Sequence, residues 1–370
     1  LFPYTTLFRS RQSGKTTLAR HTFPEKPYVN LENPDNRQFA MEDPRGFLSQ
    51  YALGAILDEA QRVPQLFSYL QQVLDESPEP GKFIITGSNN FLLQENISQS
   101  LAGRIAYLIL LPFTVSEIPG NDPLYQFMFR GLYPPVYDQP VDASTWYANY
   151  IRTYIERDVR QIKNIENLYL FEKFIRLCAG RTGQLLNMSS LAVETGVDVK
   201  TVSSWIGVLE SSYVLFRLQP HHQNFNKRVV KMPKLYFYDT GLAASLLGIQ
   251  DASQFPFHPQ TGALFENFIL AEMIKTRYNR GRQGNLYFWR DNTGHEIDVL
   301  IESAGELYPV EIKSGQTITP DFFKGLNFWK KISEKEGGTV MYAGSAHQKR
   351  SGGIEVVPWN HVHEIAALLD

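Results

Sequence analysis

Two short stretches near the start of the chain carry residue types suited to binding phosphate groups. In RQSGKTT, Gly14, Lys15 and Thr16 match the second half of G-x-x-x-x-G-K-[ST], a loop whose backbone N–H groups wrap phosphates at the start of a helix. Arg9 stands five residues before Gly14, where the pattern requires glycine. We expect nucleotide phosphates to bind through Ser13, Gly14, Lys15, Thr16 and Thr17.

The second stretch is GAILDEAQR, in which two carboxylates follow an apolar run. A carboxylate at the carboxyl end of a buried strand can hold Mg²⁺, and the next one can orient or deprotonate an attacking water. We therefore assign Asp58, together with Thr16, to the metal ion. Glu59 is assigned to the water.

Two further segments complete the candidate nucleotide site. KFIITGSNN ends in Ser88 and Asn89, which are predicted to contact the γ-phosphate side, and Arg104 in SLAGR is a candidate for stabilising transition-state charge in cis or from a neighbouring subunit. Each motif alone is common in proteins. Their order and spacing suit successive βα units that bind a ligand at the strand ends, whereas the alternative is an α/β domain that binds no nucleotide.

The elements that must position these residues are predicted by alternation along the chain. Helical patterns alternate with short apolar strands at 26–32, 54–60, 82–88 and 104–112. Such alternation predicts a parallel sheet covered by helices on both faces.

The first ten residues, LFPYTTLFRS, do not fit this scheme. They contain neither a Val/Ile-rich strand nor the loop glycine, and they resemble one reading frame of a widely used sequencing-library adapter. We therefore expect an assembly artefact in which the first strand is missing, and exclude the segment from the prediction of the fold. The alternative is a natural loop that has degenerated.

A second group of carboxylates lies near the C-terminus, in GHEIDVLIESAGELYPVEIKSG. Period-2 alternation on both sides of a turn at 304–305 predicts a hairpin. Its register places Asp298 opposite Glu311 on one face, while the apolar residues line the other. The same register places Glu296 opposite Lys313.

Directly opposed carboxylates repel each other, so this pair is unfavourable unless something compensates. A divalent cation is the candidate that we expect, because two carboxylates and a nearby lysine suit metal-assisted phosphodiester cleavage. Asp298, Glu311 and Lys313 are the predicted catalytic residues. The alternative is a surface hairpin with a salt bridge between Glu296 and Lys313.

The D…E-x-K pattern resembles the PD-(D/E)xK nuclease fold. That resemblance implies a third acidic residue on the first helix of the fold, which Glu266 in GALFENFILAEMI matches. Glu266, Asp298 and Glu311 would then be metal ligands. A nuclease-derived core that has lost activity remains an alternative, because a fold does not imply a function.

Between these regions, LNMSSLAVETGVDVKTVSSWIGVLESSYVLFRL has a helix-turn-helix pattern. Ala192, Gly196 and Val202 occupy the small, turn and buried positions, and Asp198 can cap the second helix. The strand-like YVLFRL predicts a winged form. The exposed positions of the second helix offer one cation, and a basic cluster follows at Lys227, Arg228, Lys231 and Lys234. The module either contacts DNA or packs between domains.

Composition limits the remaining possibilities. The chain has 370 residues, of which 43% are hydrophobic and 20% charged, as in ordinary globular proteins of two or three domains. A net charge of −2 leaves DNA contact to a local patch, and the single cysteine excludes an intramolecular disulfide. The longest apolar stretch, 105–113, is far below the roughly 20 residues of a membrane helix, so we expect no membrane association and a cytoplasmic location.

Taken together, several segments resemble a family of bacterial and archaeal AAA+-like P-loop ATPases with a C-terminal domain of uncharacterised function. The matching stretches are RQSGKTTLA, ILDEAQ, ITGSN, SLAGR, RGLYPP, YIERDV, YDTGL, FENFILAE and EIDVLI…VEIKSG. The resemblance implies ATP and Mg²⁺ as cofactors and ATP hydrolysis in the first domain. The departure at Arg9 puts the activity of this polypeptide in doubt.

The predicted fold is α/β, in three regions. A P-loop ATPase domain occupies 1–140, a helical and winged helix-turn-helix region 141–225, and a nuclease-like α/β domain 226–370. The predicted function is ATP hydrolysis controlling action on DNA, with a protein partner or a homo-oligomer as further possibilities. One alternative is a nucleotide switch whose C-terminal half binds proteins, and another is a DNA-binding regulator without hydrolysis.

Overall fold

The computed structural model describes most of the chain. The described residues are 5–9, 12–76, 79–87, 101, 105–154, 165, 167–222, 229–282 and 284–367, with the backbone alone described for 5–9 and 366–367. Two compact units are formed, one from 1–111 with 211–213 and the other from 112–210 with 214–370. Each unit has its own sheet.

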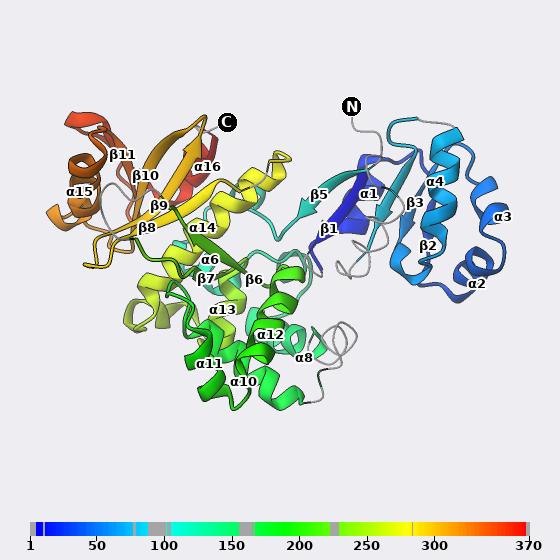
Figure 1. Cartoon of the computed structure of the whole chain (residues 1–370), viewed down its shortest axis with the longest axis horizontal. Coiled ribbons are helices and arrows are strands. Elements are labelled where there is room, and N and C mark those ends of the chain that lie inside the picture. The colour runs from blue at the N-terminus through cyan, green and yellow to red at the C-terminus, as the bar shows by residue number, and fades with distance from the viewer. Residues whose placement is uncertain are drawn as a thin grey trace. The chain divides into compact units, whose positions relative to one another are not determined.

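The first unit contains a five-stranded sheet in the order β2-β3-β4-β1-β5 (Figure 1). Its strands are β1 (Thr5–Arg9), β2 (Tyr28–Asn30), β3 (Ala55–Asp58), β4 (Phe83–Thr86) and β5 (Ala106–Leu110). Every pairing is parallel, and the last four strands lie within the four predicted segments. The prediction of a parallel sheet is therefore confirmed.

Strand β1 corrects one expectation. Residues Thr5–Arg9 form a strand that pairs in parallel with β4 on one side and β5 on the other, so the first strand is not missing. Strand pairing uses backbone N–H and C=O groups, and the sequence TTLFR is rich in residue types that favour strands. A segment without the Val/Ile-rich pattern can therefore form an interior strand of the sheet.

Helices connect these strands and place the candidate site. They are α1 (Lys15–Thr22), α2 (Pro34–Glu42), α3 (Pro44–Ser49) and α4 (Leu66–Glu76). Helix α1 packs on β3 and β4, where Ala19, Ile56 and Ile84 form a buried cluster. This packing brings the start of α1 to the carboxyl end of β3.

The second unit is built on an eight-stranded mixed sheet in the order β12-β13-β11-β10-β9-β8-β6-β7. The strands are β6 (Leu215–Pro220), β7 (Lys234–Phe237), β8 (Leu286–Arg290), β9 (Glu296–Ser303), β10 (Glu306–Lys313), β11 (Gly338–Tyr342), β12 (Gln348–Lys349) and β13 (Ile354–Pro358). Strands β10, β11 and β13 run parallel to one another. Their carboxyl ends therefore meet at one edge of the sheet.

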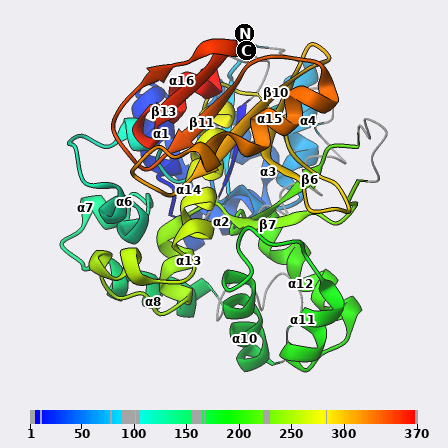
Figure 2. The same cartoon turned by 90° about the vertical axis from the view of Figure 1, so that its left-hand side faces the viewer.

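Helices surround this sheet. They are α6 (Leu124–Arg130), α7 (Pro135–Asp138), α8 (Ala143–Thr153), α10 (Leu168–Ala179), α11 (Met188–Thr195), α12 (Val199–Ser211), α13 (Thr240–Leu246), α14 (Thr261–Asn279), α15 (Lys324–Ser333) and α16 (Val362–Ala367). In Figure 1, α15 lies to the left of β9, β10 and β11, and α14 lies to their right. In Figure 2, α10, α11 and α12 lie beside one another.

Two helices, α11 and α12, follow each other across a turn within the segment predicted to be a helix-turn-helix. Gly196 ends α11 with φ 89°, Ala192 and Val202 are buried, and Asp198 Oδ1 accepts a hydrogen bond from Thr201 N at 2.9 Å. The strand that follows, β6, pairs with both β7 and β8. The expected boundary at 225–226 thus falls inside the eight-stranded sheet.

A buried carboxylate ties distant segments of this unit together. Asp239, 1% exposed, accepts hydrogen bonds from Tyr147 OH at 2.6 Å, Leu132 N at 2.7 Å and Leu242 N at 2.8 Å. A Cβ atom on Gly131 would lie 1.9 Å from the Tyr147 hydroxyl, so only glycine fits there. The stretches RGLYPP and YDTGL therefore meet at a structural joint.

Among the described residues, no helix combines the length and the apolar character needed to cross a bilayer.

Candidate functional site

The phosphate-loop helix begins directly after Gly14. That residue has φ 82°, a left-handed conformation that glycine adopts without strain, and α1 starts at Lys15. Ser13 and Lys15 are buried, and Thr17 lies at the exposed start of the helix. A helix start presents unpaired N–H groups and the positive end of the helix dipole, so this end favours an anion.

Asp58, the last residue of β3, is held by three hydroxyl groups. Thr16 Oγ1 donates to Asp58 Oδ2 at 2.8 Å, Tyr28 OH donates to the same oxygen at 2.7 Å, and Thr86 Oγ1 donates to Oδ1. Burial by itself would raise the pKa of Asp58, but these hydrogen bonds hold its pKa below the ordinary value. Asp58 is therefore a fixed negative charge beside the loop threonine.

Glu59 follows in a left-handed conformation, with φ 56°, which is uncommon for residues other than glycine. Lys15 Nζ lies 3.3 Å from Glu59 Oε1, and Gln61 Nε2 donates to Glu59 Oε2 at 2.6 Å. The structure thus brings together the loop lysine and threonine with both carboxylates of the acidic pair.

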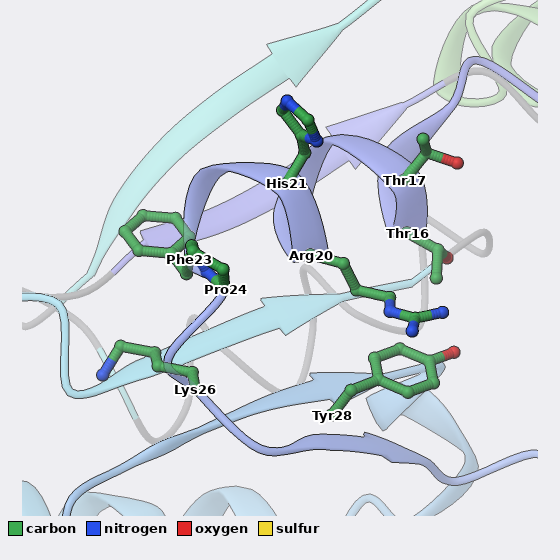
Figure 3. Close-up of a pocket in the computed structure, with 8 residues that line it drawn as sticks. All are labelled: Thr16, Thr17, Arg20, His21, Phe23, Pro24, Lys26 and Tyr28. Atoms are coloured by element: carbon green, nitrogen blue, oxygen red, sulfur yellow. The ribbon is translucent and has the colours of Figure 1, made fainter.

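A pocket of about 590 Å³ opens along α1 beside this cluster. Figure 3 shows Thr16 and Arg20 on the helix facing Tyr28 on β2, with Lys26 farther along the wall. The Arg20 guanidinium lies 5.0 Å from the centre of the Tyr28 ring. Burial and the bond to Asp58 raise the pKa of Tyr28, so its hydroxyl remains a donor.

Sequence reasoning missed Tyr28 and Thr86 as partners of Asp58. Both lie on strands next to β3, and Thr86 is the polar last residue of an apolar strand, a signal that would have identified it. The predicted Ser88, Asn89 and Arg104 lie outside the described residues.

In the second unit, the hairpin has the predicted register. Ser303 pairs with Glu306, and the ladder continues to Val299 and Val310. The predicted opposition of Asp298 and Glu311 would be the next pair. At this position the backbone N–H of Ile312 donates a hydrogen bond to Asp298 Oδ2 at 2.8 Å.

Lys313 supplies the compensating charge that we expected from a metal ion. Its ammonium lies 3.1 Å from Asp298 Oδ2 and 2.5 Å from Glu311 Oε2. Burial would lower the pKa of Lys313, but the two carboxylates raise it. In this structure the lysine of E-x-K lies between the two carboxylates and offsets their repulsion in place of the expected cation.

Glu311 is the most deeply placed of these groups. It is 3% exposed, and its Oε1 atom has no hydrogen-bond partner. Burial first, and the charge of Asp298 second, raise the pKa of Glu311 to about 8. Its Oε1 atom lies so close to Gly325 in α15 that a Cβ atom there would be 2.1 Å away.

Glu266 and Glu296 both pair with Lys234, a residue that the sequence analysis placed in a basic cluster. Lys234 on β7 lies 3.1 Å from Glu266 Oε1 and also contacts Glu296 Oε1. Tyr236 OH donates to Glu266 Oε1 at 2.5 Å, and Arg290 pairs with Glu296 at 3.1 Å. The alternative salt bridge from Glu296 to Lys313 is not formed.

We had expected Lys234 to belong to a basic cluster that could contact DNA. The structure contradicts this expectation. Lys234 is 3% exposed, because helices α10, α13 and α14 pack on β7 and its side chain is covered by the carboxylates that it neutralises. Lys231 is exposed, and Lys227 and Arg228 lie outside the described residues.

The four carboxylates are thus shared between two lysines. Among the described residues, no group of three or more carboxylate, imidazole or thiol side chains is arranged to hold a metal ion. The predicted ligand set of Glu266, Asp298 and Glu311 is not assembled, because Lys234 and Tyr236 occupy Glu266. Asp298 and Glu311 are brought together with Lys313.

Comparison with known proteins places the chain in a family. A family described as AAA domain matches residues 3–119, and two described as domains of unknown function, DUF8612 and DUF4143, match 121–253 and 261–362. Proteins described as uncharacterized from Mycobacterium bovis and Mycobacterium tuberculosis are each 30% identical over 377 residues, covering 99% of this chain and 84% of the relative. The chain belongs to the family of these mycobacterial proteins. Its first domain is an AAA domain, the type found in P-loop ATPases.

Solved structures include weaker likenesses. The Walker-type ATPase PABY2304 of Pyrococcus abyssi is 16% identical with a TM-score of 0.43, covering 66% of this chain and 91% of that chain. The Orc1 protein of Aeropyrum pernix in complex with DNA is 16% identical with a TM-score of 0.26, covering 66% and 86%.

Proposed function

We propose that the first unit binds ATP with Mg²⁺ and hydrolyses it. The observation that supports this most is the hydrogen bond of 2.8 Å between Thr16 Oγ1 and Asp58 Oδ2. A hydroxyl at the start of the loop helix and a carboxylate at a strand end are the two protein ligands that hold Mg²⁺ in P-loop ATPases. The metal ion, when bound, neutralises charge on the phosphates.

Lys15 and Glu59 have the two remaining roles, which are phosphate binding and orientation of the attacking water. Without nucleotide, the Lys15 ammonium is paired with Glu59 at 3.3 Å. A phosphate bound at the helix start competes for that ammonium, which frees a Glu59 oxygen to orient the attacking water. Phosphate binding and the availability of the general base are thus linked by one ion pair. In this proposal Ser88, Asn89 and Arg104 keep their predicted roles at the γ-phosphate.

The test uses single substitutions in a chain carrying Arg9→Gly, which supplies the glycine that the loop pattern requires. Since β1 is already in place between β4 and β5, this one change should strengthen ATP binding at least tenfold. In that background Lys15→Ala should abolish ATP binding. Glu59→Gln should still bind ATP, but its rate of phosphate release should fall about a hundredfold.

Glu42→Gln provides the matched control, because it makes the same chemical change at an exposed glutamate of the same unit. Binding is measured by equilibrium titration and hydrolysis by phosphate release. Hydrolysis at the parental rate by Glu59→Gln would refute the assigned role.

We further propose that the second unit acts on DNA through the cluster of Asp298, Glu311 and Lys313. What favours cleavage over a purely structural hairpin is the Glu311 carboxylate, which is 3% exposed with one oxygen unpartnered. Burying a carboxylate oxygen without a partner is costly, so such an atom is found where a cation or a reacting group completes the site. A divalent cation on Asp298 and Glu311 would supply that charge, and Lys313 would then turn to the scissile phosphate.

Melting of the full chain with Mn²⁺, beside a nicking assay on plasmid and single-stranded DNA, tests this proposal. A stabilising shift that disappears in Asp298→Asn, together with metal-dependent nicking, is the expected result. A shift without nicking would indicate a metal-binding but inactive relative. The absence of any shift would favour the alternative, a nucleotide switch whose C-terminal half binds proteins.

A further inference from the structure

A second cavity in the C-terminal unit lies at the sheet edge where the carboxyl ends of parallel strands meet. Its volume is about 640 Å³, and segments that follow β10, β11 and β13 form one wall. The opposite wall comes from residues 115–127, including the start of α6. No motif pointed to this pocket.

The lining combines flat apolar surface with neutral hydrogen-bonding groups. Trp359 packs against Phe127 at 5.9 Å between ring centres, which fixes the indole in the wall. Three exposed carboxamides, Asn121, Gln316 and Asn360, lie around it. Carboxamides can donate and accept at once, so they match the edges of nucleobases, and an aromatic wall can stack on a base.

Charge argues against a phosphate in this pocket. Asp122 is the charged residue of the lining, and Arg130 pairs with it at 3.1 Å. A phosphate in the pocket would be repelled by the Asp122 carboxylate, because Arg130 is already paired with that carboxylate. A neutral base would not be repelled.

The pocket is joined to the carboxylate cluster by a short covalent and hydrogen-bonded path. Ala343 in the pocket wall donates its backbone N–H to the carbonyl of Lys313 at 3.2 Å. Gln316 lies three residues beyond Lys313 along the same segment. The pocket wall and Lys313 therefore lie at the same end of β10, and a bound strand would have to pass both.

We propose that this cavity binds one unpaired nucleobase of a single-stranded nucleic acid whose backbone passes the cluster of Asp298, Glu311 and Lys313. The inference rests on the proposed action of the second unit on DNA and adds its substrate class, a strand with unpaired bases. A paired base has its edge occupied by its partner and cannot enter a pocket of this kind without leaving the duplex.

The experiment compares two decamers with equal numbers of phosphates, oligo(dT) and the same backbone with every base removed. Electrostatic attraction is the same for both, so their difference in affinity measures base contacts. The parent chain should bind oligo(dT) about tenfold more tightly, because one base contributes both stacking on Trp359 and hydrogen bonds to the carboxamides. Gln316→Ala combined with Asn360→Ala should reduce that preference to about twofold.

Asn327→Ala is the matched control, since Asn327 is an exposed asparagine that lines a different pocket of the same unit. It should leave the tenfold preference unchanged. Equal binding of both decamers by the parent would overturn the base pocket while leaving DNA binding intact. A preference that survives the double substitution would place base recognition elsewhere, and failure to bind either decamer would overturn both this inference and the proposed action on DNA.

Discussion

At the scale of single residues, the candidate sites differ in how their carboxylates are balanced. Asp58 receives hydrogen bonds on both oxygens, and these hold its pKa below the ordinary value. Glu311 is buried beside another carboxylate with one oxygen unpartnered, which raises its pKa to about 8. Opposite pKa shifts of this kind give two carboxyl groups different protonation at the same pH.

The Tyr28 hydroxyl, 2.7 Å from Asp58 Oδ2, leads to the first prediction. In the Arg9→Gly background, Tyr28→Phe should increase the Mg²⁺ concentration for half-maximal ATP hydrolysis about tenfold, because groups that orient a metal ligand affect metal affinity to this extent. Affinity for ATP without metal should change little. Tyr69→Phe is the control, since Tyr69 also lies under an arginine but on α4. Equal magnesium requirements in both variants would contradict the assigned orienting role.

The second prediction concerns pH. Because the folded state raises the pKa of Glu311 from 4.5 to about 8, the folded chain binds more protons than the unfolded chain between those values. The contribution of Glu311 to stability is therefore greatest at low pH and declines as pH rises through this window.

Glu311→Gln keeps the side-chain shape without the ionisation. Relative to the parent, its melting temperature should be similar near pH 5 and higher by a few degrees near pH 9, since about 1 kcal/mol corresponds to roughly 2–4 °C for a unit of this size. Glu302→Gln, a half-buried glutamate of the neighbouring strand, is the comparison. A constant difference between Glu311→Gln and parent at all pH values would refute the raised pKa.

At the scale of elements, helix α15 approaches β10 closely because of one glycine. A Cβ atom on Gly325 would lie 2.1 Å from Glu311 Oε1. Gly325→Ala should therefore destabilise the chain by about 1–3 kcal/mol despite the better helix propensity of alanine, because overpacking outweighs it.

The double variant Gly325→Ala with Glu311→Ala identifies the cause. Removing the carboxylate leaves room for the added methyl group, so the second substitution should recover most of the loss caused by the first. Additive effects in thermal melts of the full chain would show that the clash lies elsewhere. Gly207→Ala on α12, where an added Cβ meets nothing within 4 Å, should be neutral or stabilising.

Elements were predictable where local patterns determine them. Alternation of apolar segments predicted the parallel sheet, the turn at 304–305 predicted the register of β9 and β10, and Gly196 marked the end of α11. The motifs likewise predicted that Lys15 and Thr16 lie near the acidic pair of Asp58 and Glu59, because phosphate loops and strand ends have fixed places in such sheets.

Contacts between segments distant in sequence were not predictable. Lys234 is polar within an otherwise apolar strand, and a single sequence offered a basic surface as the simplest explanation. Only the packing of α14 on β7, and the order β9-β8-β6-β7 in the sheet, place it beside Glu266 and Glu296. The interior strand β1 was missed because backbone pairing with its neighbours overrides a weak local pattern.

At the scale of the whole molecule, the second unit is continuous across the two matched domains of unknown function. Strands β6 and β7 lie in the region 121–253, whereas β8 to β13 lie in 261–362, and all belong to one sheet. Glu272 and Lys275 on α14 also bind Val115 N and Phe113 O, at 2.7 and 2.9 Å.

This continuity predicts how fragments behave. A fragment of residues 226–370 lacks β6, which exposes one edge of β8 and of β7, and unpaired edges promote aggregation. A fragment of 112–370 keeps every strand of the sheet and should unfold cooperatively. Sedimentation and thermal melts followed by near-ultraviolet circular dichroism distinguish the two, and a monomeric, cooperatively folded 226–370 fragment would contradict the prediction.

The carboxylate of Asp239 also has a consequence for hydrogen exchange. The amide protons of Leu132 and Leu242 are both donated to this one side chain, which is 1% exposed, and they belong to segments more than a hundred residues apart. Neither proton can exchange with solvent until its bond to Asp239 breaks, so both should be among the slowest in the chain and should slow or speed together. Their common rate in deuterated water therefore reports how often the joint between α6 and α13 opens.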